Sequence, residues 1–128
     1  MKKKRILYVD ATVTNDITKI SLYDISNNLT NILELLNIKD NNIAEQYGVL
    51  YAILYAIKHN YLNCHILSDN LHAIQNKKIL QYAKDNKVSL SWIPREINIV
   101  ADKITKLDPT VKVKEWYILN AFYRLILE

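Results

Sequence analysis

The sequence predicts an α/β fold in which a three-stranded antiparallel meander is followed by alternating strands and helices. Three observations support this prediction. Three apolar runs separated by polar turns occupy residues 6–36. A longer segment, residues 42–60, carries small side chains at helical spacing. Two further β-forming runs, residues 64–68 and 88–93, are separated by a segment of helical pattern, which is typical of a strand-helix-strand layout.

Three strands are expected before the first helix. Ile6–Val13 is a strongly β-forming run in which one aspartate interrupts the apolar residues. The turn-like residues 14–16 lead into a second run, Ile17–Tyr23, and residues 26–28 lead into a third, Leu29–Leu36. Tight polar turns between consecutive runs predict antiparallel pairing of strands that are neighbours in the chain.

A long helix is expected over about Asn42–Asn60. Residues three and four apart form one stripe along it: Glu45, Gly48, Val49, Ala52 and Ala56. Apart from the glutamate, this stripe is made of small residues, so the helix can lie close on a sheet. Glu45 is expected to point from the first turn of the helix toward the first strand.

The chain then continues as strand, helix and strand. Cys64–Ser68 is predicted to be a fourth strand, and Leu71–Lys87 to be one or two short helices, divided at residues 76–78 if there are two. Val88–Ile93 is predicted to be a fifth strand that stops at Pro94, because proline cannot donate to a strand ladder.

Two more helices are expected near the end of the chain. Asn98 is a good N-cap for a helix that runs to about Leu107. Val111–Glu128 is predicted to form a helix that is apolar around most of its circumference. It either packs on its own domain or makes a homodimer or docks a protein partner. We therefore expect a domain over residues 1–107 and a helical extension over residues 108–128.

Four carboxylates occupy these elements in one order: Asp10, Glu45, Asp69 and Asp102. Each has an ordinary structural alternative. Asp10 can be a charge on an edge strand or a salt-bridge partner, Glu45 and Asp102 can be first-turn helix acids, and Asp69 can be an N-cap. A carboxylate that is costly to desolvate is usually kept where a cation neutralises it. Four that converge on these elements indicate a divalent-metal site.

From about Ile6 to Leu107 the chain resembles the type-1 ribonuclease H family. Asn41–Glu45 is similar to the family's Asn-Asn-x-x-Glu helix start, and Ser68–Asn70 resembles its strand-end motif. The most specific match is residues 94–102, which resemble the Arg-Glu-x-Asn-x-x-Ala-Asp ending of the retroelement and plant branches. The resemblance implies a ribonuclease H-like fold with a five-stranded mixed sheet of order 3-2-1-4-5, strand 2 antiparallel, flanked by helices.

The same resemblance implies hydrolysis of the RNA strand of RNA/DNA hybrids with two Mg²⁺ ions, which Mn²⁺ can replace. Asp10 then bridges both ions, and Glu45 and Asp69 hold the ion on the leaving-group side. Asp102 holds the ion that carries the nucleophilic water. All four residues are therefore expected to be metal ligands and catalytic residues.

Further residues correspond to family positions around the substrate. Asn41 and Asn42 match positions that touch the substrate backbone and the RNA hydroxyls, and Thr12 and Asn70 are also expected to bind substrate. Many members carry a histidine in the loop before the last aspartate, where it is thought to help product release. Arg95 occupies that region here, so the resemblance implies a related catalytic role for it.

The chain also departs from the family, which leaves other functions open. Ala11 follows Asp10 where the family usually has glycine, and no glycine precedes Gly48. One alternative is a nuclease of the same fold that acts on double-stranded RNA or structured DNA. Another is a ribonuclease H-like module that binds nucleic acid or protein without cutting it.

Composition and residue spacing limit the kinds of partner, compartment and metal site that fit this chain. A net charge of +4 mildly favours a polyanionic partner. Cys64 is the only cysteine, which excludes an intrachain disulfide and favours a reducing, cytoplasmic location. His59, His65 and His72 do not have metal-ligand spacing. No apolar stretch is long enough to cross a bilayer, so no membrane association is expected.

Overall fold

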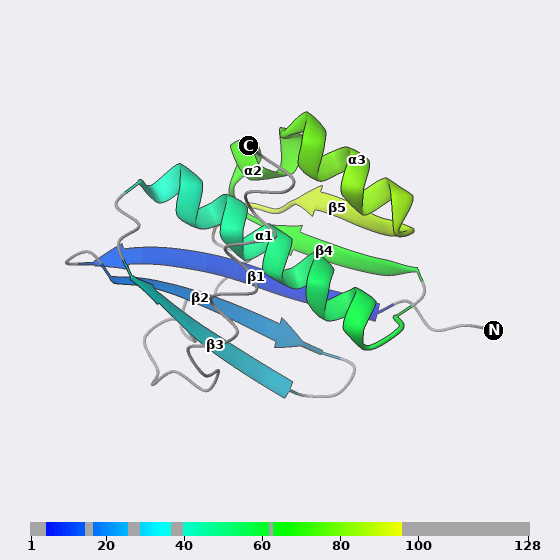
Figure 1. Cartoon of the computed structure of the whole chain (residues 1–128), viewed down its shortest axis with the longest axis horizontal. Helices are drawn as coiled ribbons and strands as arrows, with labels where there is room; N and C mark the ends of the chain where they lie inside the picture. Colours follow the sequence, from blue (N-terminus) through cyan, green and yellow to red (C-terminus); the bar gives the residue numbers. More distant parts are fainter. Residues whose placement is uncertain (1–4, 15–16, 26–28, 37–39, 62, 96–128) are drawn as a thin grey trace.

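The computed structural model describes residues 5–14, 17–25, 29–36, 40–61 and 63–95. Their elements follow one another as β1 (Arg5–Thr14), β2 (Ile17–Asp24), β3 (Leu29–Leu36), α1 (Asn41–Lys58), β4 (Cys64–Ser68), α2 (Leu71–Gln75), α3 (Lys77–Asp85) and β5 (Val88–Trp92). Figure 1 shows these elements. Every strand and helix expected before residue 94 is confirmed, with small shifts at the ends, and the segment after β4 forms two helices. The helices expected after Asn98 and over Val111–Glu128 lie outside the described residues.

The strands form one five-stranded sheet of order β3-β2-β1-β4-β5. β2 pairs antiparallel with both β1 and β3, whereas β4 pairs parallel with both β1 and β5. Short turns can join only antiparallel neighbours, and α1 is the crossover that allows β4 to lie parallel to β1. The expected mixed sheet and its strand order are therefore confirmed.

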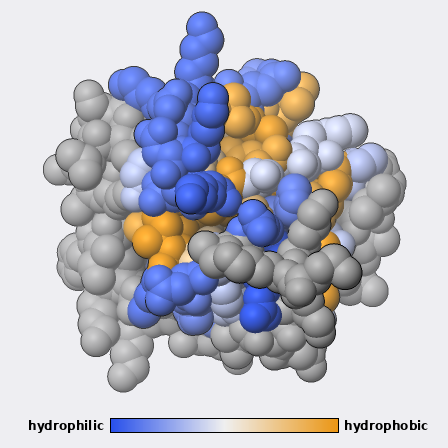
Figure 2. All heavy atoms as spheres, turned by 90° about the vertical axis from the view of Figure 1, so that its right-hand side faces the viewer, coloured by the Kyte–Doolittle hydropathy of each residue, from blue (hydrophilic) through white to orange (hydrophobic). Residues whose placement is uncertain are grey.

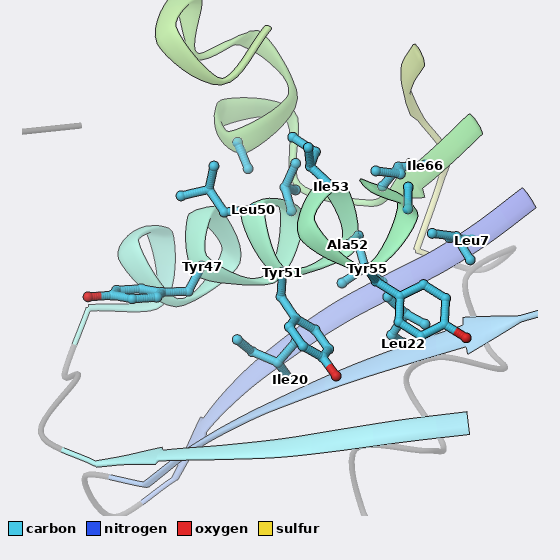
Figure 3. Close-up of a cluster of buried hydrophobic side chains, with 14 of the residues drawn as sticks. Leu7, Ile20, Leu22, Tyr47, Leu50, Tyr51, Ala52, Ile53, Tyr55 and Ile66 are labelled. Carbon is cyan, nitrogen blue, oxygen red and sulfur yellow. The ribbon is translucent and has the colours of Figure 1, made fainter. Parts of the chain in front are cut away.

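α1 packs across the face of the sheet that carries Val9, Ala11 and Ile20 (Figure 1). Gly48 lies at this contact: a Cβ built there would be 3.4 Å from Val9 Cγ2 and 3.7 Å from Ile20 Cγ2. The large side chains of α1 fill the space around this approach, and Figure 3 shows Tyr51 reaching toward the sheet. The predicted stripe of small residues is therefore the surface on which α1 meets the sheet.

A buried polar cluster closes the end of the sheet where β1 begins. The Asp24 side chain is fully buried and accepts hydrogen bonds from the Tyr55 hydroxyl, at 3.2 Å, and from the Tyr61 hydroxyl. The Arg5 guanidinium lies 4.9 Å from the centre of the Tyr61 ring. Hydrophilic side chains gather on this side of the molecule beside smaller apolar patches (Figure 2). The cluster ties the end of β2 to the end of α1 and to the turn before β4.

Within the described ranges, no helix has the combination of length and hydropathy that a membrane span requires.

Candidate metal centre

Asp10 lies in β1 where that strand continues past its neighbour β4. Its neighbours Val9 and Ala11 belong to the core beneath α1. The pairing of β1 with β4 ends at Tyr8 and Leu67, while the pairing with β2 continues beyond Asp10. At Asp10 and Ala11 this edge of β1 is therefore not paired with β4, and side chains from other elements can contact it.

The start of α1 is fixed by Asp40, which the sequence analysis did not single out. Asp40 is the N-cap: its Oδ1 accepts hydrogen bonds from the backbone N–H groups of Asn42, at 2.7 Å, and Ile43, at 3.2 Å. Such a cap satisfies amide groups that have no partner within the helix. An aspartate directly before Asn41 is the local signal that would have located this cap in the sequence.

Glu45 lies one turn inside α1 and reaches the open edge of β1. It is 7% exposed, and its Oε1 accepts a hydrogen bond of 3.2 Å from the Ala11 N–H. The first turn of α1, beginning at Asn41, contains no acidic residue. The expectation that Glu45 belongs to the first turn is therefore wrong, because the helix begins earlier than its apolar pattern. The position of Glu45 is therefore explained by the contact of its side chain with β1, and not by the helix dipole.

Asp69 follows the last residue of β4, and its neighbours fix the turn around it. The Asn70 N–H donates to Ser68 Oγ at 3.1 Å, and Asn70 Oδ1 accepts from the Ala73 N–H at 2.9 Å. Asn70 is therefore the N-cap of α2, not Asp69. The alternative of Asp69 as an N-cap is wrong, and its carboxylate is available to the cluster. The indole N–H of Trp92 donates to the Asp69 carbonyl oxygen at 3.1 Å.

The carboxylates of Asp10, Glu45 and Asp69 meet in one cluster. One oxygen from each lies within 4.8 Å of the others, with Asp10 and Glu45 buried and Asp69 partly buried. Burial, followed by the negative charges of Asp10 and Asp69, raises the pKa of Glu45 to about 9, while the hydrogen bond from Ala11 acts in the opposite direction. Three crowded oxygen ligands suit a hard cation such as Mg²⁺ or Mn²⁺. A divalent ion would neutralise the repulsion within the cluster.

A cavity of about 400 Å³ opens beside this cluster. Its walls include Asp10, Ala11, Thr12, Val13, Asn41, Asn42, Glu45, Asn70 and Arg95. The substrate residues expected from the sequence thus line the same cavity as Asp10 and Glu45. Asp69 contributes its carboxylate to the cluster beside this cavity. Asp102 lies outside the described residues, so its expected role stays a prediction.

Trp92 is the other residue at this site that the sequence analysis missed. It is the last residue of β5 and is 49% exposed. Its bond to Asp69 joins residues 23 positions apart. No local sequence pattern predicts such a bond, because the bond depends on the pairing of β4 with β5.

Comparison of the sequence with protein-family models and with curated proteins gives no match. Solved structures do match the fold. The chain is similar to RNase H1 from the halophilic archaeon Halobacterium salinarum NRC-1, with a TM-score of 0.57, 14% identity, and coverage of 80% of this chain and 94% of that chain. It is also similar to LC11-RNase H1 in complex with an RNA/DNA hybrid, with a TM-score of 0.56, 16% identity, and coverage of 78% and 92%.

A retroviral protein gives a similar result. The catalytic core domain of BIV integrase matches with a TM-score of 0.51 and 16% identity, covering 79% of this chain and 61% of that chain. RNase H1 and retroviral integrase cores share the ribonuclease H-like fold, and this chain has that fold too. The resemblance seen in the sequence is confirmed at the level of the fold. Function has to be argued from the site.

Proposed function

We propose that this protein is a metal-dependent endonuclease that hydrolyses the RNA strand of RNA/DNA hybrids by a two-metal-ion mechanism. The observation that carries the proposal is the cluster of Asp10, Glu45 and Asp69, within 4.8 Å of one another, beside a polar cavity on a ribonuclease H-like sheet. Burial, followed by the negative charges of Asp10 and Asp69, raises the pKa of Glu45, so all three carboxyl groups are costly to keep ionised without a cation. A site built around a cation explains why such costly groups are kept.

We take the roles of the carboxylates from the resemblance to the ribonuclease H family. When bound, two divalent ions would activate water on one side of a phosphodiester and stabilise the leaving oxygen on the other. Asp10 would contact both ions, with Glu45 and Asp69 on the leaving-group side and Asp102 on the side of the water. The Ala11 N–H holds Glu45 Oε1, so the orientation of that carboxylate is set before any ion arrives.

The cavity walls support a nucleic-acid substrate. Asn41, Asn42 and Asn70 bring amide groups to the walls, and Thr12 brings a hydroxyl. Such groups can donate to and accept from the ribose 2′-hydroxyl, which distinguishes RNA from DNA. Among the described residues of the lining, Arg95 is the single cationic side chain, and a guanidinium suits a phosphate oxygen. We assign Arg95 to the scissile phosphate or the departing product.

A cleavage assay tests this proposal. Labelled RNA/DNA hybrid, double-stranded RNA and duplex DNA are each incubated with the protein and Mg²⁺ or Mn²⁺. We expect cleavage of the RNA strand of the hybrid, and its loss in Asp10→Asn and Asp69→Asn. Asp85→Asn is the matched control because Asp85 is exposed on α3, outside the carboxylate cluster.

Each result has a defined meaning. Equal cleavage by the parent and Asp10→Asn would refute the metal centre. Metal-dependent cleavage of double-stranded RNA or DNA in preference to hybrid would keep the centre and replace the substrate. Binding of hybrid without cleavage under either metal would favour a non-catalytic module.

A further inference from the structure

The ends of β4 and β5 are joined beside the carboxylate cluster by both backbone and side chain. Ser68 pairs with Trp92 in the parallel register, and the Ile93 N–H donates to the Ser68 carbonyl oxygen at 2.9 Å. One residue past the end of β4, the Asp69 carbonyl oxygen accepts a hydrogen bond of 3.1 Å from the indole N–H of Trp92. The indole thus extends the link between the two strands to the residue that carries the third carboxylate.

The exposure of Trp92 makes this bond informative. Its side chain is 49% exposed, the highest value among the exposed large hydrophobic side chains of the described ranges. The indole is therefore not held in place by full burial in a core. Its one polar hydrogen is nevertheless directed at the backbone of a cluster residue. A bond that fixes the backbone of a ligand residue also limits the directions that its carboxylate can take.

We infer that Trp92 is a positioning residue for the metal centre, acting through the Asp69 carbonyl oxygen. Asp69 lies beyond the last paired residue of β4, where the strand ladder no longer sets its backbone. The hydrogen bond from the indole N–H fixes the backbone of Asp69 instead, and this keeps the Asp69 carboxylate close to Asp10 and Glu45. This inference rests on the proposed function only in so far as the three carboxylates bind a divalent ion.

The experiment measures Mn²⁺ binding in the absence of nucleic acid. Free Mn²⁺ is followed by electron paramagnetic resonance during titration of the parent and of Trp92→Phe, which keeps an aromatic ring and removes the N–H. Loss of a direct hydrogen-bond partner of a ligating side chain typically weakens binding by about 10- to 100-fold, and Trp92 acts through the Asp69 backbone, so the lower end of this range applies. We expect a loss of about tenfold for Trp92→Phe and a similar loss for Trp92→Ala.

Leu71→Ala is the matched control. Leu71 follows Asn70 at the start of α2 and is 48% exposed, so the control removes a comparable exposed apolar side chain next to the site. It should bind Mn²⁺ as the parent does. Circular dichroism and urea denaturation establish that each variant is folded at the temperature of the titration.

The outcomes separate this inference from the proposed function. If the parent binds Mn²⁺ no better than Asp10→Asn, the metal centre itself is refuted. If the parent binds Mn²⁺ and Trp92→Phe binds it equally well, only the role of Trp92 is refuted. Normal Mn²⁺ binding combined with a raised KM for hybrid in Trp92→Ala would also overturn the inference, since the ring would then contact substrate.

Discussion

Replacing Glu45 by glutamine should stabilise the metal-free protein progressively as the pH rises above about 4.5. Glu45 is buried beside Asp10 and Asp69, and this environment raises its pKa from 4.5 to about 9. Between these values the folded protein keeps the Glu45 proton, whereas the unfolded chain has released it. The unfolded state then binds fewer protons, so the free energy of unfolding of the parent falls as the pH rises.

The magnitude follows from the width of this pH window. A group that is protonated only in the folded state changes the free energy of unfolding by about 1.4 kcal/mol per pH unit. From pH 4.5 to pH 7 the contribution of Glu45 therefore falls by about 3 kcal/mol. Glutamine has the shape of the neutral acid and can still accept the Ala11 hydrogen bond, but it does not titrate. The stability of Glu45→Gln relative to the parent should rise by the same amount.

Urea denaturation between pH 5 and pH 8, with a chelator present, measures this difference. Other titrating groups contribute equally to both proteins and cancel. Glu34→Gln makes the same chemical change on β3, outside the carboxylate cluster, and serves as control. Parallel pH profiles for Glu45→Gln and the parent would refute the reasoning. Calorimetry of Mg²⁺ binding at pH 7 provides a second test, because the parent must release a proton on binding and the variant has none to release.

Three further predictions concern other parts of the chain. Arg95→Ala should slow hybrid cleavage by about ten- to a hundredfold, the range of one charge-assisted contact, and a loss as complete as that of Asp10→Asn would contradict this role. Tyr61→Phe should lower the free energy of unfolding by about 1–3 kcal/mol, because buried Asp24 loses a donor; an unchanged urea midpoint would show that the bond is dispensable. Removing residues 108–128 should give insoluble or poorly folded protein, and a soluble, fully active truncated form would refute both the core packing and the interface expected of this segment.

The sequence located the elements well because their signals are local. Apolar, β-forming runs and short polar turns define the strands of the meander, and each signal lies within a few residues of the element it predicts. The small residues around Gly48 likewise predicted the surface on which α1 approaches the sheet. The expected start of α1, at about Asn42, lies one residue after the observed start at Asn41, because the Asp40 cap, and not the apolar stripe, fixes where the helix begins.

The sequence by itself determined the fold class, the strand order through its family resemblance, and the identity of the candidate ligands Asp10, Glu45 and Asp69. Only the tertiary structure decided that these three carboxylates meet, since they belong to a strand, a helix and a turn far apart in the chain. It also decided the Ala11 bond to Glu45, the raised pKa of that residue and the Trp92 bond to Asp69. Each of these depends on where β1 continues past β4 and on how β4 pairs with β5, and no local pattern encodes distances across a sheet.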